Sequence, residues 1–269
     1  MPRWIVTVCV LGLLILCLAG SDWLAAQAPS AAPQEGRGGG GAAAPPPPRQ
    51  EPQRSTRITF PPLLWREDWK YDYSQPNVNR PDEPEHPVVQ GDVGNPNLEV
   101  RTYGHKEGVW MVDQAFNDHM MYVMTLLCES NCALTLRDKN NYMDLSGVAT
   151  LRWRTRVSGF HFLRPIIKLA DGRWLVGDKG VPGPQTAWAV SEIQMVDVRW
   201  RNLDIERVVE ARDGYWVDYP DLTRVDEIGF TDLMRGSGHG SGGGSRVDWI
   251  EVYGRPVPRG ASSTQRSGQ

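Results

Sequence analysis

Short runs of alternating apolar and polar residues recur from Asn97 onward, with turn residues between them. The clearest run spans 149–157, where tryptophan and aliphatic residues occupy one set of alternate positions. Arg152, Arg154 and Arg156 occupy the other set. A period of two with large apolar residues on one side is typical of a half-buried strand.

The rest of the pattern decides the fold class. No stretch of ten or more residues has the spacing of an amphipathic helix. About ten short strands separated by turns are typical of sandwiches and jelly rolls. We therefore predict an all-β fold, a β-sandwich of jelly-roll type, with Trp153 and Trp249 at apolar strand positions in its core.

Three segments inside the domain have turn or loop chemistry. The stretch Ala170–Arg173 separates two apolar runs and contains Asp-Gly, which predicts a hairpin with a type I′ turn, where both central residues need positive φ. Five prolines between Gln75 and Pro96 predict a long surface loop with a functional role. The glycine-rich tract Gly236–Ser245 lacks the Lys-Ser/Thr ending of a P-loop, and we expect a mobile hairpin loop there.

The N-terminus has the order of a secretory signal: a positive start, an apolar run from Ile5 to Ala19, and small residues near Ala26. The apolar run is shorter than the roughly 20 residues of a membrane-spanning helix, which favours cleavage over an uncleaved anchor. We predict a signal peptide over 1–26, a disordered Ala/Gly/Pro linker over 27–56, a single β-sandwich domain over 57–259 and a disordered tail over 260–269.

Charge and cysteine content narrow the partners and the compartment. The net charge of −3 argues against nucleic acid or an anionic membrane held by bulk charge. Processing would leave Cys128 and Cys132. In an oxidising compartment, a pair this close can close a small disulfide loop, with two reduced thiols as the alternative. We expect the disulfide, and a secreted or periplasmic protein with no membrane span after processing.

Tryptophan is abundant in the predicted domain. Trp4 and Trp23 precede Ala26, so nine of the 11 tryptophans would remain after cleavage. A tryptophan ring is a flat apolar plane with a polar edge, which suits the C–H face of a sugar ring. Five tryptophans near loops or strand ends are candidate ligand-binding residues, with burial as the alternative for each. They are Trp65, Trp69, Trp110, Trp188 and Trp216.

The arginines of the run 149–157 form a second candidate group. Guanidinium forks recognise carboxylates and can donate to sugar hydroxyls. A sheet face that carries Arg152, Arg154 and Arg156 beside tryptophan could bind an acidic or neutral polysaccharide. The alternative is a solvated outer face whose arginines pair with nearby carboxylates.

Acidic residues gather late in the chain, where adjacent strands could bring carboxylates together to hold calcium or to serve as the acid–base pair of a glycosidase. They are Asp221, Asp226, Glu227, Asp232, Asp248 and Glu251. The sequence has no EF-hand spacing, no G-x-S-x-G elbow and no H-E-x-x-H pair. The catalytic residues of any enzyme activity are therefore unknown from the sequence.

The segments VDEIGFTDL (Val225–Leu233) and RVDWIEVYG (Arg246–Gly254) resemble the last two strands of galactose-binding-like jelly rolls, the fold of many carbohydrate-binding modules. The stretch Thr150–Val176 is similar to their central strands and to the related sandwich of complex I intermediate-associated proteins. The resemblance implies a sandwich with a carbohydrate or a protein as its partner. It also implies a structural calcium ion near the final strand, where this chain has Asp226, Asp248 and Glu251.

Together these features predict an exported carbohydrate-binding β-sandwich that binds a polysaccharide or glycan without catalysis. One alternative is a jelly-roll glycoside hydrolase or lyase that uses a carboxylate pair. The other is an envelope protein-interaction module. Exposed tryptophans along a groove would favour binding, and two facing carboxyls in a pocket would favour an enzyme. A flat apolar patch of several hundred Å² or so would favour a protein partner.

Overall fold

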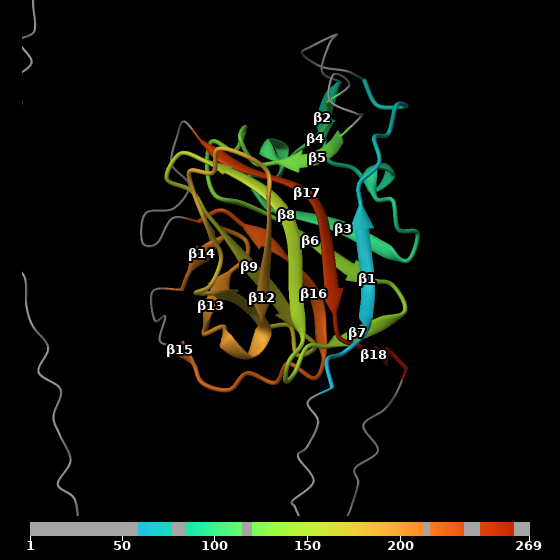
Figure 1. Cartoon of the computed structure of the whole chain (residues 1–269), viewed down its shortest axis with the longest axis vertical. Helices are drawn as coiled ribbons and strands as arrows, with labels where there is room; N and C mark the ends of the chain where they lie inside the picture. Colours follow the sequence, from blue (N-terminus) through green and yellow to red (C-terminus); the bar gives the residue numbers. More distant parts are fainter. Residues whose placement is uncertain (1–58, 77–83, 115–119, 212–215, 234–242, 261–269) are drawn as a thin grey trace, which may run out of the picture. The chain divides into compact units, whose positions relative to one another are not determined.

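Figure 1 shows the computed structural model, which describes residues 59–76, 84–114, 120–211, 216–233 and 243–260. The predicted signal peptide (1–26) and linker (27–56) lie outside the described residues, as do 261–269 of the predicted tail and most of the glycine-rich tract. Within the described parts of the chain, no helix is long and apolar enough to cross a membrane.

Two antiparallel sheets, A and B, form the structure (Figure 1). Sheet A has the strand order β12-β8-β17-β5-β4-β2, and β1 also pairs with β17. Its strands are β1 (Leu63–Asp68), β2 (Glu85–Pro87), β4 (Trp110–Gln114), β5 (Met120–Met124), β8 (Thr150–Ser158), β12 (Ala189–Gln194) and β17 (Gly244–Tyr253).

Sheet B has the strand order β14-β13-β10-β9-β16-β6-β3, and four short strands pair at its margins. The main strands are β3 (Leu98–Gly104), β6 (Cys132–Asp138), β9 (Phe162–Leu169), β10 (Trp174–Gly177), β13 (Trp200–Asp204), β14 (Val209–Glu210) and β16 (Val225–Thr231). The marginal strands are β7 (Asn141–Asp144), β11 (Val181–Pro182), β15 (Trp216–Val217) and β18 (Arg255–Pro258).

The all-β sandwich predicted from the sequence is confirmed. The helical turns in the described residues are three short 3₁₀ segments, η1 (Gln90–Asp92), η2 (Lys106–Gly108) and η3 (Met195–Asp197).

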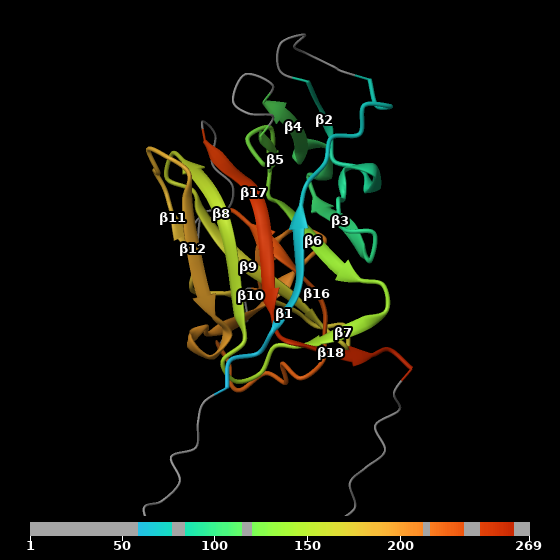
Figure 2. The ribbon, with the colours of Figure 1, turned by 45° about the vertical axis from the view of Figure 1, so that its right-hand side comes forward.

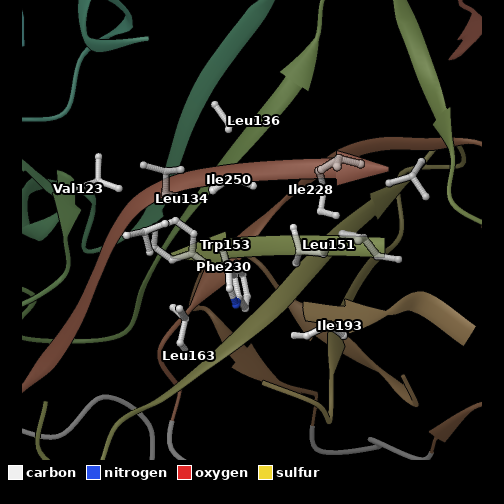
Figure 3. Packing of buried hydrophobic residues seen from close by; sticks show 14 of the residues in the cluster. Val123, Leu134, Leu136, Leu151, Trp153, Leu163, Ile193, Ile228, Phe230 and Ile250 are labelled. Atoms are coloured by element: carbon white, nitrogen blue, oxygen red, sulfur yellow. The ribbon is translucent and has the colours of Figure 1, made fainter. Parts of the chain in front are cut away.

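The core lies between the two sheets, and β8 shows how the sequence builds it. Trp153 is fully buried, and its alternate neighbours Leu151 and Val157 are buried with it, as their spacing predicts. Figure 3 shows Trp153 with Phe230 of β16 and Leu163 of β9, which belong to the same cluster of buried residues. Alternation places the arginines of β8 on the other face of sheet A, which is its outer face.

Strand β17 holds sheet A together. It pairs with β8 along its whole length, with β5 near Arg246 and Val247, and with β1 from Trp249 to Tyr253. Figure 2 shows β1 running beside β17 on the side away from β8. A strand with partners on both sides leaves few backbone groups unpaired, so β17 is an interior strand over most of its length.

The predicted hairpin over Ala170–Arg173 joins β9 to β10, but its turn is not type I′. Gly172 has a φ of 92°, and among described non-glycine residues only Val208 and Tyr219 have positive φ. The amide of Gly172 donates to the carbonyl of Leu169 at 2.9 Å. This is a three-residue loop with the glycine in the left-handed position, which tolerates Asp171 in ordinary turn geometry.

The proline-rich segment between Gln75 and Pro96 is only partly a surface loop. Its described part contains β2 and η1, and His86 and Asp92 are buried there. The His86 Nε2 and Asp92 Oδ1 atoms are 3.3 Å apart, and burial raises the pKa of Asp92. The prolines end the regular segments, as expected, but the residues between them pack against sheet A.

The outer face of sheet B carries a polar network and, beside it, an apolar cluster that includes Ala133, Ile166 and Val176. The polar network is centred on Glu227, which is fully buried. The Glu227 carboxylate accepts hydrogen bonds from Arg101 and Lys168 at 2.9 and 3.1 Å. It also accepts from Tyr103 and Thr135 at 2.8 and 2.7 Å. Its charge is therefore neutralised and its oxygens are bonded, which a buried carboxylate requires.

Candidate functional site

A cavity of about 520 Å³ opens at the end of the sandwich where β13 and β15 meet. We call it the end cavity. This volume lies in the range of small-molecule sites. Three segments line it: the turn at Ser146 and Gly147, the stretch from Met195 to Trp200, and the stretch from Trp216 to Thr223.

Aromatic side chains dominate the mouth of the end cavity. Trp200 is buried and belongs to the core, whereas Trp216 is half-buried. Tyr219 is 100% exposed, and its φ of 47° lies in the left-handed region. A tyrosine in that backbone conformation is strained, and such strain concentrates at functional sites. Val196, 62% exposed, adds an apolar surface beside these rings.

Two arginines fix the orientation of Trp216. The guanidinium carbons of Arg199 and Arg201 lie 4.0 and 4.3 Å from the centroid of the Trp216 ring, within cation–π range. Arg201 also forms an ion pair of 2.6 Å with Glu210, which in turn bonds the buried Arg164. One of the two cations beside the ring, Arg201, is therefore anchored in sheet B through Glu210.

Two carboxylates, Asp218 and Asp221, supply hydrogen-bond acceptors at the cavity. Asp221 accepts hydrogen bonds from the backbone amide and the hydroxyl of Thr223, at 3.0 and 2.6 Å. These bonds lower the pKa of Asp221 below its usual range. Asp218 and Ser146 also line the cavity. An ionised carboxylate suits the acceptance of hydrogen bonds from hydroxyl groups, and it does not serve as a proton donor.

The strongest candidate for a protonated carboxyl lies elsewhere. Burial raises the pKa of Glu67 to about 7. Its carboxylate accepts hydrogen bonds from the backbone amides of Gly94 and Asn95 at 2.6 and 3.0 Å. Glu67 is fully buried and does not line the end cavity, so its role is to anchor the loop before β3.

Three of the five candidate tryptophans are buried. Trp65 and Trp69 are 6% and 5% exposed and belong to the main core. Trp110 is 9% exposed and packs with Val112 and Tyr122. Burial, the alternative stated for each of these tryptophans, therefore holds for these three, and they offer no exposed ring face to a sugar. Strands β1 and β4 pair with their neighbours in sheet A, and these tryptophans pack into its apolar clusters.

The other two candidate tryptophans are both half-buried, but the structure does not bring them together. Trp216 lines the end cavity, on the sheet B side of the molecule. Trp188 precedes β12 and packs edge-on against Tyr122 of sheet A, with ring centroids 5.4 Å apart. They therefore belong to two separate surfaces.

The arginine row of β8 lies on the outer face of sheet A, as the alternation predicts. Arg152 pairs with Glu251 at 3.2 Å, and Arg154 pairs with Asp248 at 2.6 Å. Arg156 is exposed. The alternative of a solvated, ion-paired face thus describes Arg152 and Arg154. It does not describe Arg156, for which no ion pair with a described residue is present.

Trp249 was expected in the core, and the structure corrects this. It is half-buried on the outer face of sheet A, with Arg66 and Arg152 4.5 and 5.6 Å from its ring centroid. The register shift between Val247 and Trp249 changes the alternation of β17, so the sequence pattern assigned Trp249 to the wrong face.

The three acids expected to hold calcium do not form one site. Asp226 is on β16 of sheet B, where Arg137 and Arg259 bond it at 2.9 and 2.6 Å. Asp248 and Glu251 are on β17 of sheet A and pair with arginines. Among the residues that the structure describes, no three His, Cys, Asp or Glu side chains form a potential metal site. The strands β16 and β17 follow one another in the chain, but they lie in different sheets, so their acidic residues do not meet.

The disulfide between Cys128 and Cys132 is present, as expected. It closes the turn between β5 and β6, and both residues are buried. Gly108 packs directly on the backbone of Cys128, where a side chain would clash.

Sequence analysis missed the residues that complete the end cavity, Tyr219, Val196 and Arg199. One signal was available at Tyr219, which stands between two aspartates and directly before Pro220. The residue before a proline is kept out of the helical region, so an aromatic side chain there sits in a turn rather than in an element. Nothing in the local pattern indicated which other segment would face it.

No protein-family model and no curated protein matches the sequence. Similar solved structures include a family 11 carbohydrate-binding module from Clostridium thermocellum in complex with a β-1,3-1,4-mixed-linked tetrasaccharide. That module is 16% identical with a TM-score of 0.31, and the match covers 71% of this chain and 98% of the module.

Two further solved structures are similar. A structure associated with endo-acting O-glycanases of the human gut microbiota is 12% identical with a TM-score of 0.32, and the match covers 72% of this chain and 99% of that one. PfGH50B is 10% identical with a TM-score of 0.35, over 61% of this chain and 24% of PfGH50B. The chain thus spans about a quarter of PfGH50B. Likeness at this level says nothing about the site or the function of this chain.

Proposed function

We propose that this protein is a carbohydrate-binding module without catalytic activity, and that the end cavity is its sugar-binding site. The observation that carries the proposal is that a fully exposed Tyr219 and a half-buried Trp216 both line a cavity of about 520 Å³. An aromatic ring packs on the apolar face of a pyranose, and neighbouring polar groups bond its hydroxyls.

The polar groups favour binding over hydrolysis. A glycosidase needs one carboxyl that stays protonated near neutral pH and a second that is ionised. At the end cavity the described carboxyls are Asp218 and Asp221, and the pKa of Asp221 is lowered. Asp221 therefore does not supply the general acid. It is better suited to accept hydrogen bonds from sugar hydroxyls.

We also propose that the protein works outside the cytoplasm. The bonded pair Cys128–Cys132 supports this, because disulfides persist in oxidising compartments. The order of charged, apolar and small residues at the N-terminus supports it as well.

The test is a glycan array with the purified chain, followed by tryptophan fluorescence titration of each glycan that binds. Tyr219→Ala should weaken binding about tenfold, because it removes one stacking ring. Phe160→Ala is the matched control, since Phe160 is 89% exposed in the turn between β8 and β9 and does not line the cavity.

Three outcomes would contradict the proposal. Silence across the array would favour the protein-interaction alternative. Release of new reducing ends from a bound glycan would identify an enzyme. Equal weakening by Tyr219→Ala and Phe160→Ala would show that the end cavity is not the sugar site.

A further inference from the structure

Two arginines face each other on the outer face of sheet A. Arg156 of β8 and Arg246 of β17 are direct partners in the antiparallel register. Their neighbours Val157 and Val247 are fully buried in the core, so alternation sends both arginine side chains outward. Directly opposed residues of an antiparallel pair have Cβ atoms roughly 5 Å apart.

This pair differs from the rest of the arginine row. Arg152 and Arg154 are neutralised by Glu251 and Asp248, as described above. Within the described residues, neither Arg156 nor Arg246 forms an ion pair or a side-chain hydrogen bond. Like charges placed directly opposite are destabilising, so the sheet carries unneutralised positive charge at this point.

Apolar residues of the neighbouring strands border the two arginines, and Met124 among them is buried. Arg246 is opposite Met124 of β5, and Ala189 of β12 is opposite Thr155, the residue before Arg156. Trp188, directly before Ala189, is half-buried, and its ring lies 5.5 Å from the guanidinium carbon of Arg154. A partly exposed indole therefore lies on the same face, in contact range of Arg154, the arginine two positions before Arg156.

We propose that Arg156, Arg246 and Trp188 form a second binding site, which takes an acidic sugar unit of a polysaccharide. The two guanidinium forks would bond a carboxylate or a sulfate ester, groups that share the oxyanion chemistry arginine recognises. Trp188 would pack on the sugar ring. The site is on sheet A, apart from the residues of the end cavity, and it does not depend on the function proposed for that cavity.

The surrounding charge favours a sparsely charged polysaccharide over a nucleic acid or a membrane. The net charge of the chain is −3. The same outer face also carries Asp248 and Glu251. A dense polyanion or an anionic bilayer would approach these carboxylates as well as the arginines, whereas one acidic sugar would meet only the arginine pair.

The test measures binding of the full chain to sulfated dextran and to carboxymethyl dextran, each of low degree of substitution, by affinity electrophoresis, with uncharged dextran as the reference. Arg156→Gln and Arg246→Gln should each weaken the interaction about tenfold, the usual effect of losing a hydrogen bond to a charged group. Arg207→Gln is the matched control, because Arg207 is 82% exposed in the turn between β13 and β14. The polyanion that binds identifies the group as sulfate or carboxylate.

Two further measurements separate binding from structure. Neither substitution should lower the melting temperature without ligand, because each removes a repulsive contact. Tyr219→Ala should leave binding of the polyanion unchanged, so failure here and failure at the end cavity are distinguishable. The proposal is overturned if neither polyanion binds, if Arg207→Gln weakens binding as much, or if duplex DNA or phosphatidylserine vesicles bind as tightly.

Discussion

The Glu67 carboxyl is unfavourable to ionise in the folded protein, because it is buried. It is fully buried, and burial raises its pKa to about 7 despite the two backbone amides that bond it. The folded state therefore holds this proton to a higher pH than the unfolded state, where the pKa is near 4.5. The stability that Glu67 contributes is complete below pH 4.5 and is lost as the pH rises through 7.

Glu67→Gln should flatten this dependence. Between pH 5 and pH 8, the free energy of unfolding of the unmodified chain should fall about 2–3 kcal/mol more than that of the variant. Urea unfolding at the two pH values measures this difference. Glu206→Gln, in an exposed turn, should keep the original slope. Parallel slopes for the chain and Glu67→Gln would mean that Glu67 titrates normally.

Trp153 and Trp249 lie on opposite faces of sheet A, so their substitution should change the free energy of unfolding by different amounts. Trp153→Ala should lower the free energy of unfolding by about 3–5 kcal/mol, because Trp153 is fully buried. Trp249→Ala should cost about 1 kcal/mol, mostly its contact with Arg66. Chemical denaturation of both variants tests this order, and equal losses would place Trp249 in the core after all.

At the scale of elements, β16 combines a core face and a polar face. Ile228 and Phe230 enter the core, while Glu227 bonds residues from β3, β6 and β9 on the other face. One carboxylate thus connects four neighbouring strands of sheet B. Such a network stabilises only while each partner is satisfied.

Glu227→Gln should therefore destabilise the sheet even though it preserves shape. Arg101 and Lys168 would lose their anionic partner, and the free energy of unfolding should fall by about 2 kcal/mol, since both cations are partly exposed and regain water. Denaturant unfolding gives the value. The same change at Glu206 should stay within about 0.5 kcal/mol, and a comparably small effect at Glu227 would show that the network adds little.

The sequence predicted the positions of strands and turns better than the exact backbone geometry within them. Alternation over 149–157 located β8 and its outward arginines, because a period of two is a property of the strand alone. The turn at Ala170–Arg173 was located, but its type depends on whether Asp171 adopts positive φ, which the dipeptide does not decide. The irregularity in β17 moved Trp249, and no sequence period marks such a shift.

At the scale of the whole molecule, the all-β sandwich could be predicted, but the site could be predicted only in part. Trp216 was found by its residue type. Its cavity partners come from segments as distant as Ser146 and Tyr219, which only the packing of the two sheets brings together. The sequence left exposure and burial both open for Trp65 and Trp69, because the pairing of β1 with β17, which decides it, spans almost the whole domain.

That pairing has a consequence for how the chain is made. Strand β1 begins at Leu63, but its partner β17 begins only at Gly244, about 180 residues later in the chain. A ribosome would have to finish nearly the whole domain before β17 could join β8, β5 and β1. Contacts between residues so far apart in sequence make folding slow. Sheet A should therefore remain incomplete until nearly the whole domain has been synthesised, whereas the main strands of sheet B are available earlier.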